Sequence, residues 1–471
     1  MIEGVKPYAE YKESGQKWLG QVPGHWSMRR LRASISDCAN GVWGSDPNGK
    51  DDLICVRVAD FDRVSHRVSL KKKTLRAIPL SARSRRLLRN GDLLLEKSGG
   101  GDLQPVGAVV SYDHDDPAVC SNFVARMPLA DGYDSHFAVS LHFTLYASRI
   151  NVLSIKQTTG IQNLDSKAYL REVVAFPPPD EQAAIVRFLD HANRKIDGFI
   201  RAKRKLIGLL NEQKQAIIHR AVTRGLHPDI PLKPSGIPWL GDIPKHWEQH
   251  SLWTLTKLRT DRNPGNLQLL SVFLDRGVIR YAEGGGQVHA PSLDLSNYQV
   301  AMPGDFVLNN QQAWRGSVGV SFHQGIISPA YIVLKLSPKL DPTFTNYLMR
   351  SRAMVDQFVA ASKGVGDIQR QVFWPFLRMV HVPVPNMKEQ RQIVEFLTNE
   401  TRSLNTAIAR TEREIALMQE YRTRLTADLV TGKLDVREAA RRLPDEAPLD
   451  TVEDDTDLSD ETEAADEEAA V

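Results

Sequence analysis

Four polar loops carry the residues of this chain whose types suit contact with nucleic acid. Amide side chains pair with adenine and arginine or lysine pairs with guanine, so such residues can read base edges. In the first half of the chain they are Lys97, Ser98, Gln104, Thr159, Gln162 and Asn163. In the second half they are Asn310, Gln311, Gln312, Arg315, Lys363, Gln369 and Arg370. The alternative for each loop is an ordinary polar surface turn.

Catalytic motifs are hard to find. The sequence has no G-x-x-x-x-G-K-[ST] phosphate loop, no G-x-G-x-x-G after a strand, and no Asn/Asp-Pro-Pro-aromatic run of the amino-methyltransferase kind. His246 and His250 are four residues apart, but the loop that contains His246 recurs without the second histidine. The three cysteines have neither zinc nor disulfide spacing. We therefore expect no catalysis and no bound metal or cofactor in this chain.

The charge of the chain is unevenly distributed. Its net charge of +3 includes 13 acidic and no basic residues from Asp445 to Val471, so residues 1–444 carry 60 basic against 44 acidic side chains, or +16. A basic folded part is typical of a protein that meets a polyanion, although many basic proteins bind no nucleic acid. The acidic tail has too few apolar residues to pack, and we expect it to be disordered. With no apolar run long enough for a signal peptide or a membrane helix, we expect a cytoplasmic protein.

Two long stretches have the heptad pattern of helices that pack along their length. The first covers 180–223 and follows three prolines, and the second runs from Met387 to Thr431. The predicted seam consists of Ile185, Leu189, Ile196, Leu206, Leu210 and Ile217 in the first helix and of Leu397, Leu404, Ile408, Ile415, Met418 and Leu425 in the second. Two helices of equal length with one apolar stripe each can pack side by side. A lone heptad helix could instead dimerise with another chain, but the internal partner has the higher effective concentration.

The two halves of the chain repeat each other. SGQKWLGQVPGHW at 14–26 returns as SGIPWLGDIPKHW at 235–247, an offset of 221. Glu181-Gln182 returns as Glu389-Gln390, an offset of 208. Each repeated loop is predicted to bury its indoles, Trp18 and Trp26 or Trp239 and Trp247. A tandem duplication explains these matches economically.

The blocks between the repeated segments diverge in sequence. We predict short strands at 53–58, 92–95, 106–110, 269–272, 305–308 and 332–334, and helices at 137–148 and 343–360. Each block is then a small mixed domain, which makes the class α+β. The predicted division is an N-terminal segment 1–26, a first recognition domain 27–176, a central helix 177–226, a linker 227–247, a second recognition domain 248–385, a C-terminal helix 386–435 and an acidic tail 436–471.

Together, WLGQVPGHW, WLGDIPKHW, PPPDEQAAIVRFLD, VPNMKEQRQIVEFLT and the block–helix–block–helix order resemble the specificity subunits of type I restriction-modification systems. The resemblance covers nearly all of residues 10–435 and implies two target-recognition domains held by a pseudo-twofold, antiparallel coiled coil of two conserved helices. It also implies a non-catalytic subunit that recognises a bipartite double-stranded DNA sequence. The implied partners are two modification subunits, which methylate adenine with S-adenosylmethionine, and restriction subunits that use ATP and magnesium. The alternative is a protein–protein scaffold whose basic surface is incidental.

Overall fold

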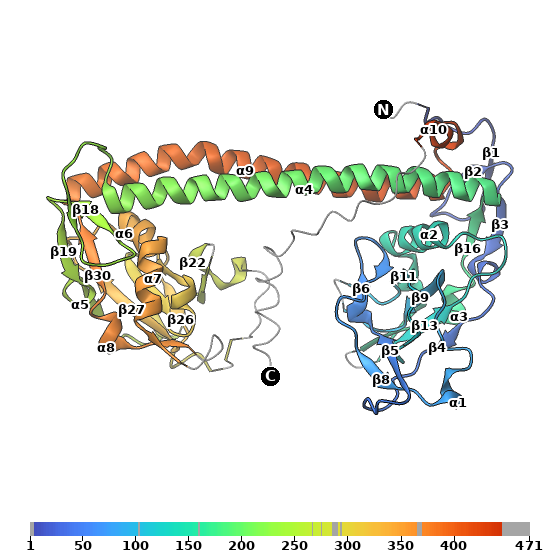
Figure 1. Cartoon of the computed structure of the whole chain (residues 1–471), viewed down its shortest axis with the longest axis horizontal. Helices are drawn as coiled ribbons and strands as arrows, with labels where there is room; N and C mark the ends of the chain where they lie inside the picture. The colour runs from blue at the N-terminus through green and yellow to red at the C-terminus, as the bar shows by residue number, and fades with distance from the viewer. Residues whose placement is uncertain are drawn as a thin grey trace. The chain divides into compact units, whose positions relative to one another are not determined.

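The structure is a computed structural model that describes residues 4–101, 104–158, 161–265, 267–274, 276–284, 291–292, 294–364 and 370–444 (Figure 1). These residues form two compact units, unit 1 from 4–203 and 413–444 and unit 2 from Arg204–Glu412. Each unit mixes helices and strands, which confirms the predicted mixed helix-and-strand class.

Unit 1 is built on a twisted sheet with the described strand order β4-β13-β9-β11-β7-β6. These strands are β4 (Ala39–Asn40), β13 (Val124–Met127), β9 (Asp92–Glu96), β11 (Val109–Tyr112), β7 (Arg67–Val68) and β6 (Phe61–Asp62). A second sheet, β12-β5-β8, contains β12 (Ala118–Cys120), β5 (Asp52–Val56) and β8 (Leu75–Ala77), followed by α1 (Leu80–Arg83). The smaller pairs are β1 (Tyr11–Glu13) with β2 (Gln21–Pro23) and β3 (Ser27–Arg30) with β16 (Val173–Phe176). β9, at the centre, is buried along its whole length.

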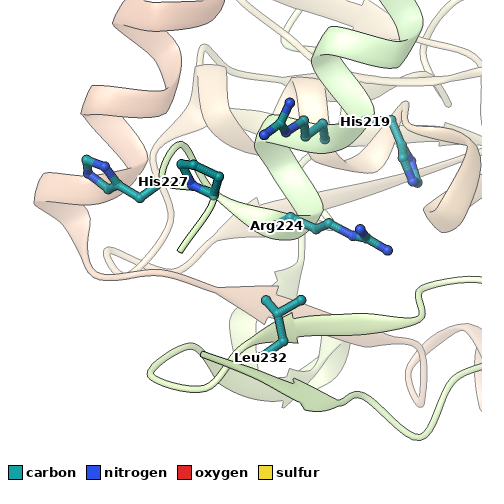
Figure 2. Close-up of a pocket in the computed structure, with 7 residues that line it drawn as sticks. His219, Arg224, His227 and Leu232 are labelled. Atoms are coloured by element: carbon teal, nitrogen blue, oxygen red, sulfur yellow. The ribbon is translucent and has the colours of Figure 1, made fainter. Parts of the chain in front are cut away.

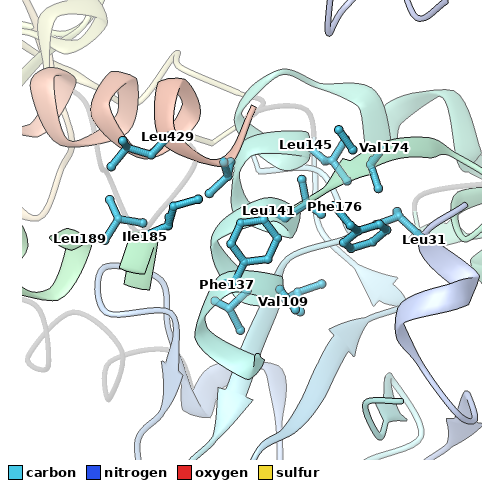
Figure 3. Packing of buried hydrophobic residues seen from close by; sticks show 14 of the residues in the cluster. Leu31, Val109, Phe137, Leu141, Leu145, Val174, Phe176, Ile185, Leu189 and Leu429 are labelled. Atoms are coloured by element: carbon cyan, nitrogen blue, oxygen red, sulfur yellow. The ribbon is translucent and has the colours of Figure 1, made fainter. Parts of the chain in front are cut away.

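Helix α2 (Ser135–Ala147) connects this sheet to the long helices. Asp134 caps its first turn by accepting a hydrogen bond from the Phe137 N–H. Phe137 and Leu141 then pack in one buried cluster with Ile185 and Leu429, which come from the two long helices (Figure 3). The core of unit 1 therefore runs without a break from the sheet through α2 to the helix pair.

Unit 2 repeats the plan with fewer strands. Its main sheet has the order β20-β27-β24-β25, with β20 (Thr256–Leu258), β27 (Tyr331–Leu336), β24 (Asp305–Asn309) and β25 (Val318–Val320). Further described pairs are β17 (Leu232–Pro234) with β18 (Asp242–Pro244), β19 (Glu248–Ser251) with β30 (His381–Val384), β21 (Leu270–Phe273) with β22 (Gly277–Arg280), and β23 (Gln299–Ala301) with β26 (Gly325–Ile327). Its helices are α5 (Leu252–Leu255), α6 (Pro342–Met349), α7 (Arg352–Ala360) and α8 (Trp374–Leu377). The single helix predicted at 343–360 is thus two helices, because Ser351 has extended backbone angles.

Both main sheets contain the same buried ion pair. Asp92 opens β9 and Asp305 opens β24, each after a glycine with positive φ. The Arg126 guanidinium lies 2.6 Å from the Asp92 carboxylate, and the Arg259 guanidinium lies 2.6 Å from the Asp305 carboxylate. Arg126 lies in β13, whereas Arg259 follows β20. The aspartate therefore occupies the same position in both sheets, and the arginine that pairs with it comes from a different strand in each.

The long helices are α4 (Pro179–Arg224) and α9 (Met387–Val430), and each contributes residues to both units. In unit 1, Arg422 donates to Asp197, and the Lys203 amine lies 2.7 Å from the Glu414 carboxylate. In unit 2, Lys214 donates to the Asn405 side chain and Ile218 shares a core with Leu397. Residue numbers rise along α4 as they fall along α9, so the helices are antiparallel within each unit.

The contact line along α4 differs from the predicted heptad seam. Ile185, Leu189 and Ile196 are buried as predicted positions, and Leu210 and Ile217 are half-buried. Leu206 is 41% exposed, however, and Ile207 is the less exposed neighbour. The line steps four residues from Ile196 to the buried Ile200, so Ile200 and Ile207 take the places predicted for positions 199 and 206, while Leu210 and Ile217 keep theirs. Such an extra step locally gives about 3.67 residues per turn.

On α9 the predicted line continues without such a shift. Leu397 and Leu425 are buried, and Leu404, Ile408, Ile415 and Met418 are half-buried. Polar side chains interrupt the apolar line, because Thr401 and Thr411 are buried within it. Each threonine hydroxyl donates to the carbonyl four residues earlier, which satisfies it inside the helix.

The repeated Glu-Gln pair fixes each block to its helix. The Trp26 indole N–H donates to Glu181 Oε1 at 3.0 Å, and the Trp247 indole N–H donates to Glu389 Oε1 at 3.0 Å. His25 and His246 each lie 2.8 Å from the other oxygen of the same glutamate. The repeated loops are therefore locked to the first turn of α4 and of α9 by identical contacts.

The glutamines act one residue further along. Gln182 accepts a hydrogen bond from the Asp134 N–H at 2.9 Å, and Gln390 accepts one from the Asp341 N–H at 2.7 Å. Asp134 and Asp341 are the N-caps of α2 and α6. A glutamine at the start of each long helix thus holds the start of the helix that covers the sheet.

The four tryptophans of the repeated loops are not equivalent. Trp26 and Trp247 are fully buried, whereas Trp239 is 41% exposed and Trp18 is half-buried. The prediction of a buried indole is therefore wrong for Trp239. The reason is that the anchoring contact, an indole N–H on a helix glutamate, belongs to the second tryptophan of each loop.

The segments near the two ends of the chain close unit 1. Val436, Ala439 and Ala440, in and beside α10 (Arg437–Arg442), pack in the same cluster as Tyr8 and Leu429. Lys6 pairs with Asp435 backbone to backbone, and the Tyr8 hydroxyl donates to Glu181. Burial and this carboxylate raise the pKa of Tyr8 well above its usual range. Among the described residues, none of the helices is long and apolar enough to cross a membrane.

Candidate nucleic-acid interface

In unit 1 the structure brings two of the predicted loops together. The chain leaves β9 at Glu96 and enters β10 (Ser98–Gly99), which pairs with β15 (Ile161–Leu164). Ser98 faces Asn163 in this register, and the Leu164 N–H donates to the Lys97 carbonyl at 2.8 Å. β14 (Ile155–Thr158) completes this small sheet. Residues more than sixty positions apart therefore share one edge.

The side chains at this edge are polar and largely accessible. The Ser98 hydroxyl donates to the Asn163 side chain at 2.5 Å, and the Lys97 amine donates to the Asn40 side chain at 2.6 Å. We call Asn40, Lys97, Ser98 and Asn163 the unit 1 polar edge. Phe123, 47% exposed, adjoins it because its carbonyl accepts the Lys97 N–H. Hydroxyl, amide and amine groups beside an exposed ring can contact bases and phosphates.

The other residues predicted for unit 1 have different positions. Gln162 is buried, and its side-chain oxygen accepts the Val106 N–H, so it supports the edge from within. Gln104 is exposed, and its carbonyl closes a turn with the Gly101 N–H. Thr159 lies outside the described residues. Gly100 makes this turn with a φ of +63°, where a Cβ would lie 2.8 Å from the Gln104 oxygen.

A buried carboxylate lies directly behind the unit 1 polar edge. Glu96 is 1% exposed, and Arg63 donates to it at 3.0 Å. Burial raises the pKa of Glu96, and the nearby guanidinium partly offsets this effect. The Arg63–Glu96 pair therefore fixes the end of β9 from which Lys97 projects.

Unit 2 brings its two predicted loops together at the corresponding place. Asn310 follows β24, and its carbonyl accepts the Val372 N–H at 2.9 Å. Val372 belongs to β29 (Gln371–Val372), which pairs with β28 (Ser362–Lys363). The short helix η5 (Ala313–Arg315) lies between these parts of the chain. The loop after β24 and the loop before α8 thus meet as their counterparts do in unit 1.

Cation–aromatic contacts dominate the unit 2 edge. The Arg370 and Arg315 guanidinium carbons lie 5.3 and 5.5 Å from the centre of the Trp314 ring. The Lys363 amine lies 4.5 Å from the centre of the Phe376 ring. We call Asn310, Trp314, Arg315 and Arg370 the unit 2 polar edge. Gln311 is exposed, Gln312 is half-buried, and Gln369 lies outside the described residues.

Sequence reasoning missed some of these residues. Asn40 comes from β4 and Phe123 from the turn before β13, both far from the loops in the sequence, and no local pattern marks them. Trp314 stands in the predicted loop, where one aromatic residue among amides was a usable signal. Two arginines in and beside α1 are engaged in ion pairs, because Arg85 contacts Asp37 at 2.7 Å and Arg83 contacts Asp51 at 3.3 Å.

A separate pocket of about 360 Å³ lies at the C-terminal end of α4 in unit 2 (Figure 2). It is lined by His219, Arg220, Arg224, Gly225, His227, Pro228 and Leu232. Cationic side chains are favourable at a helix C-terminus because of the helix dipole, which accounts for their number here. His246, the histidine considered for metal binding, instead contacts Glu389. Among the described residues, no group of three or more His, Cys, Asp or Glu could hold a metal ion.

Comparison with solved structures defines the class of fold. A chain from a structure described as the "structural basis underlying complex assembly and conformational transition of the type I R-M system" aligns with a TM-score of 0.58. The alignment covers 87% of this chain and 98% of that one at 15% identity. The protein therefore has the fold of a chain from a type I restriction-modification structure.

Curated relatives extend this likeness to the amino-acid sequence. The chain is 25% identical over 315 residues to the type I restriction enzyme MjaVIII specificity subunit of Methanocaldococcus jannaschii, covering 63% of this chain and 70% of that protein. It is 20% identical to the putative MjaX specificity subunit of the same organism, covering 91% and 98%. No family model matches the chain. The relatives confirm the resemblance to specificity subunits of type I restriction enzymes.

Proposed function

We propose that this chain is the DNA-binding specificity subunit of a type I restriction-modification enzyme. Each unit reads one half of a bipartite, asymmetric site in double-stranded DNA through its polar edge. The chain performs no catalysis. Methylation with S-adenosylmethionine belongs to two partner modification subunits, and ATP- and magnesium-dependent cleavage belongs to partner restriction subunits.

The observation that carries this proposal is the convergence of two distant polar loops at one edge in each unit. Lys97 and Ser98 meet Asn163 in unit 1, and Asn310 meets the strand after Arg370 in unit 2. In both cases the loop follows the central strand of a buried sheet, which is a rigid support. Sites on regular, packed elements hold side chains more accurately than free loops do.

The repeated contacts support a division into frame and reader. The Glu181–Trp26 and Glu389–Trp247 bonds join the same atoms at the same distance, 3.0 Å, whereas the polar edges contain different residues. We infer that the repeated loops and the long helices form a duplicated, pseudo-twofold support. Each copy of this support positions a different polar edge for contact with DNA. A scaffold that binds only proteins would have no need of two dissimilar polar edges.

We propose that α4 and α9 form an antiparallel coiled coil that sets the spacer between the half-sites and docks the modification subunits. The continuous helices, with 46 and 44 residues, support this role. Exposed apolar residues on the unit 1 part of the helices, Phe199, Leu417 and Tyr421, suit contact with a partner protein.

The test is sequencing of methylated adenines in cells that express this chain with its modification subunits. A bipartite motif that disappears without this chain supports the proposal. In gel shifts at one fixed salt concentration, the complex should bind that motif more tightly than random DNA. Methylation without any motif would contradict it and favour the scaffold. The purified chain alone, given S-adenosylmethionine, ATP and magnesium, should neither methylate nor cleave DNA.

A further inference from the structure

Two unlike sets of donors occupy the polar edges, and they suit different bases. The unit 1 polar edge contains an amine that is bonded to Asn40, a hydroxyl and an amide. The unit 2 polar edge contains two guanidinium groups on one indole ring. A guanidinium fork matches the O6 and N7 acceptors of guanine, which lie together in the major groove.

Arg370 is the better placed of the two arginines. It is half-buried, and its Nε is inaccessible to solvent and has no hydrogen-bond partner among the described residues. Because Nε is turned inward, the accessible donors are the paired terminal nitrogens. Neither Arg370 nor the exposed Arg315 forms an ion pair in the part of the chain that the structure describes.

The indole beneath Arg370 is held in place by the backbone. The Trp314 N–H donates to the Gln311 carbonyl at 2.8 Å. Gly316 ends η5 with a φ of +104°, a conformation that an L side chain rarely adopts. A guanidinium stacked on a fixed ring loses less freedom on binding than a free one, which is how a stacked arginine becomes a selective contact.

The same edge also has an unmet acceptor. The Asn310 side-chain oxygen is inaccessible to solvent and has no partner among the described residues. Leaving a buried polar atom without a hydrogen bond costs free energy. At this edge a donor of Arg370 and an acceptor of Asn310 are therefore both left without a partner among the described residues.

We propose that Arg370, positioned by Trp314, reads a guanine in the half-site of unit 2, and that Trp314 acts only as a positioning residue. This inference rests on the proposed function. The half-site of unit 1 is read by a different set of donors, an amine, a hydroxyl and an amide.

The experiment uses the complex of the full chain with its modification subunits on a plasmid library in which one half-site at a time is randomised. Methylated sequences are counted. In Arg370→Ala, discrimination for guanine at one position should fall roughly ten- to hundred-fold, with the other positions unchanged. In Arg370→Gln, preference at that position should move toward adenine, which a glutamine amide matches. Trp314→Leu should weaken the guanine preference at the same position, and Trp314→Phe, which keeps an aromatic ring, should retain most of that preference.

The controls separate this inference from the proposed function. Arg378→Ala removes an exposed arginine of the same unit and should relax no single position. Asn163→Ala should alter only the other half-site. A uniform loss over all sequences in Arg370→Ala, with a salt slope reduced by about one, would identify a phosphate contact and overturn the inference. Unchanged guanine preference in a folded Arg370→Ala would do the same, whereas a wild-type complex without any sequence preference would overturn the proposed function itself.

Discussion

At the scale of single residues, one glutamate at the start of each long helix organises a unit. Glu181 is 2% exposed and accepts hydrogen bonds from the Tyr8 hydroxyl and the Trp26 indole, and it also contacts His25. Glu389 makes the tryptophan and histidine contacts without a tyrosine. The carboxylate concentrates several buried donors on one group, so its removal leaves them all unpaired.

We therefore predict that Glu181→Ala lowers the free energy of unfolding by roughly 3 kcal/mol, because buried donors lose their acceptor. Glu389→Ala should cost less, since no tyrosine hydroxyl depends on it. Urea unfolding followed by tryptophan fluorescence measures both. Glu395→Ala, an exposed glutamate on α9, is the control and should change stability by less than about 0.5 kcal/mol. Equally small losses of unfolding free energy in all three variants would show that the contacts of Glu181 and Glu389 do not stabilise the fold.

A buried histidine makes the stability of unit 1 depend on pH. His142 is 1% exposed, and its Nδ1 lies 2.7 Å from the Tyr169 hydroxyl. Burial lowers the pKa of His142 to about 4. The unfolded chain, with a histidine pKa near 6.5, binds the proton more readily, so stability is lost as pH falls from about 6.5 toward 4.

Between pH 7 and pH 5, His142 should therefore contribute a loss on the order of 2 kcal/mol. His142→Gln keeps a hydrogen-bonding partner for Tyr169 and should remove most of that loss. Urea midpoints at the two pH values measure the difference. His227→Gln, at an exposed histidine, is the control and should leave the pH dependence of stability unchanged. If His142→Gln also left it unchanged, protonation of His142 would not be the cause of the loss.

At the scale of elements, the pairing of α4 with α9 shows what a heptad pattern can predict. The two helices and their apolar stripes can be predicted from the sequence because the heptad spacing of apolar residues continues over many turns. The four-residue step after Ile196 is not, because α4 has adjacent apolar residues at 199–200, 206–207 and 209–210. Both registers are therefore apolar, and only the folded structure shows that Ile200 and Ile207 are less exposed than Phe199 and Leu206.

This register yields a paired prediction. Leu206→Ala should change the free energy of unfolding by less than about 0.5 kcal/mol, and Ile207→Ala should cost roughly 1 kcal/mol or more, because Ile207 is the less exposed of the two side chains. Thermal or urea unfolding of the two single variants decides between the registers. A larger loss for Leu206→Ala would restore the uninterrupted heptad.

The candidate site was predictable only in part for a related reason. Lys97, Ser98, Asn163 and Arg370 stand out by residue type beside glycines, so the loops could be named from the sequence. Their meeting depends on strand pairs such as Ser98 with Asn163, which join short segments far apart in the chain. Gln162 resembles its neighbours in the sequence but is buried, because side chains alternate across a strand.

At the scale of the whole molecule, the proposed role of the helices as a spacer makes a quantitative prediction. Inserting seven residues in each helix at paired positions preserves the heptad faces and lengthens the pair by about 10 Å. The preferred spacer between half-sites should then grow by about three base pairs, since base pairs are stacked about 3.4 Å apart. Methylation sequencing reads the spacer directly. As a control, exchange of residues 27–175 for another recognition domain should alter one half-site and leave the spacer unchanged.

The composition of unit 1 has a consequence for how the protein is made. Among the described residues, unit 2 is one continuous stretch, Arg204–Glu412, whereas the core of unit 1 also contains Leu425, Leu429, Val436 and Ala439, which follow unit 2 in the sequence. During synthesis the ribosome releases all of unit 2 before the first unit can close. Unit 1, although its synthesis begins first, can close only when the end of α9 and α10 have emerged, so a message cut short after Glu412 would yield a chain with a complete unit 2 and an open core in unit 1.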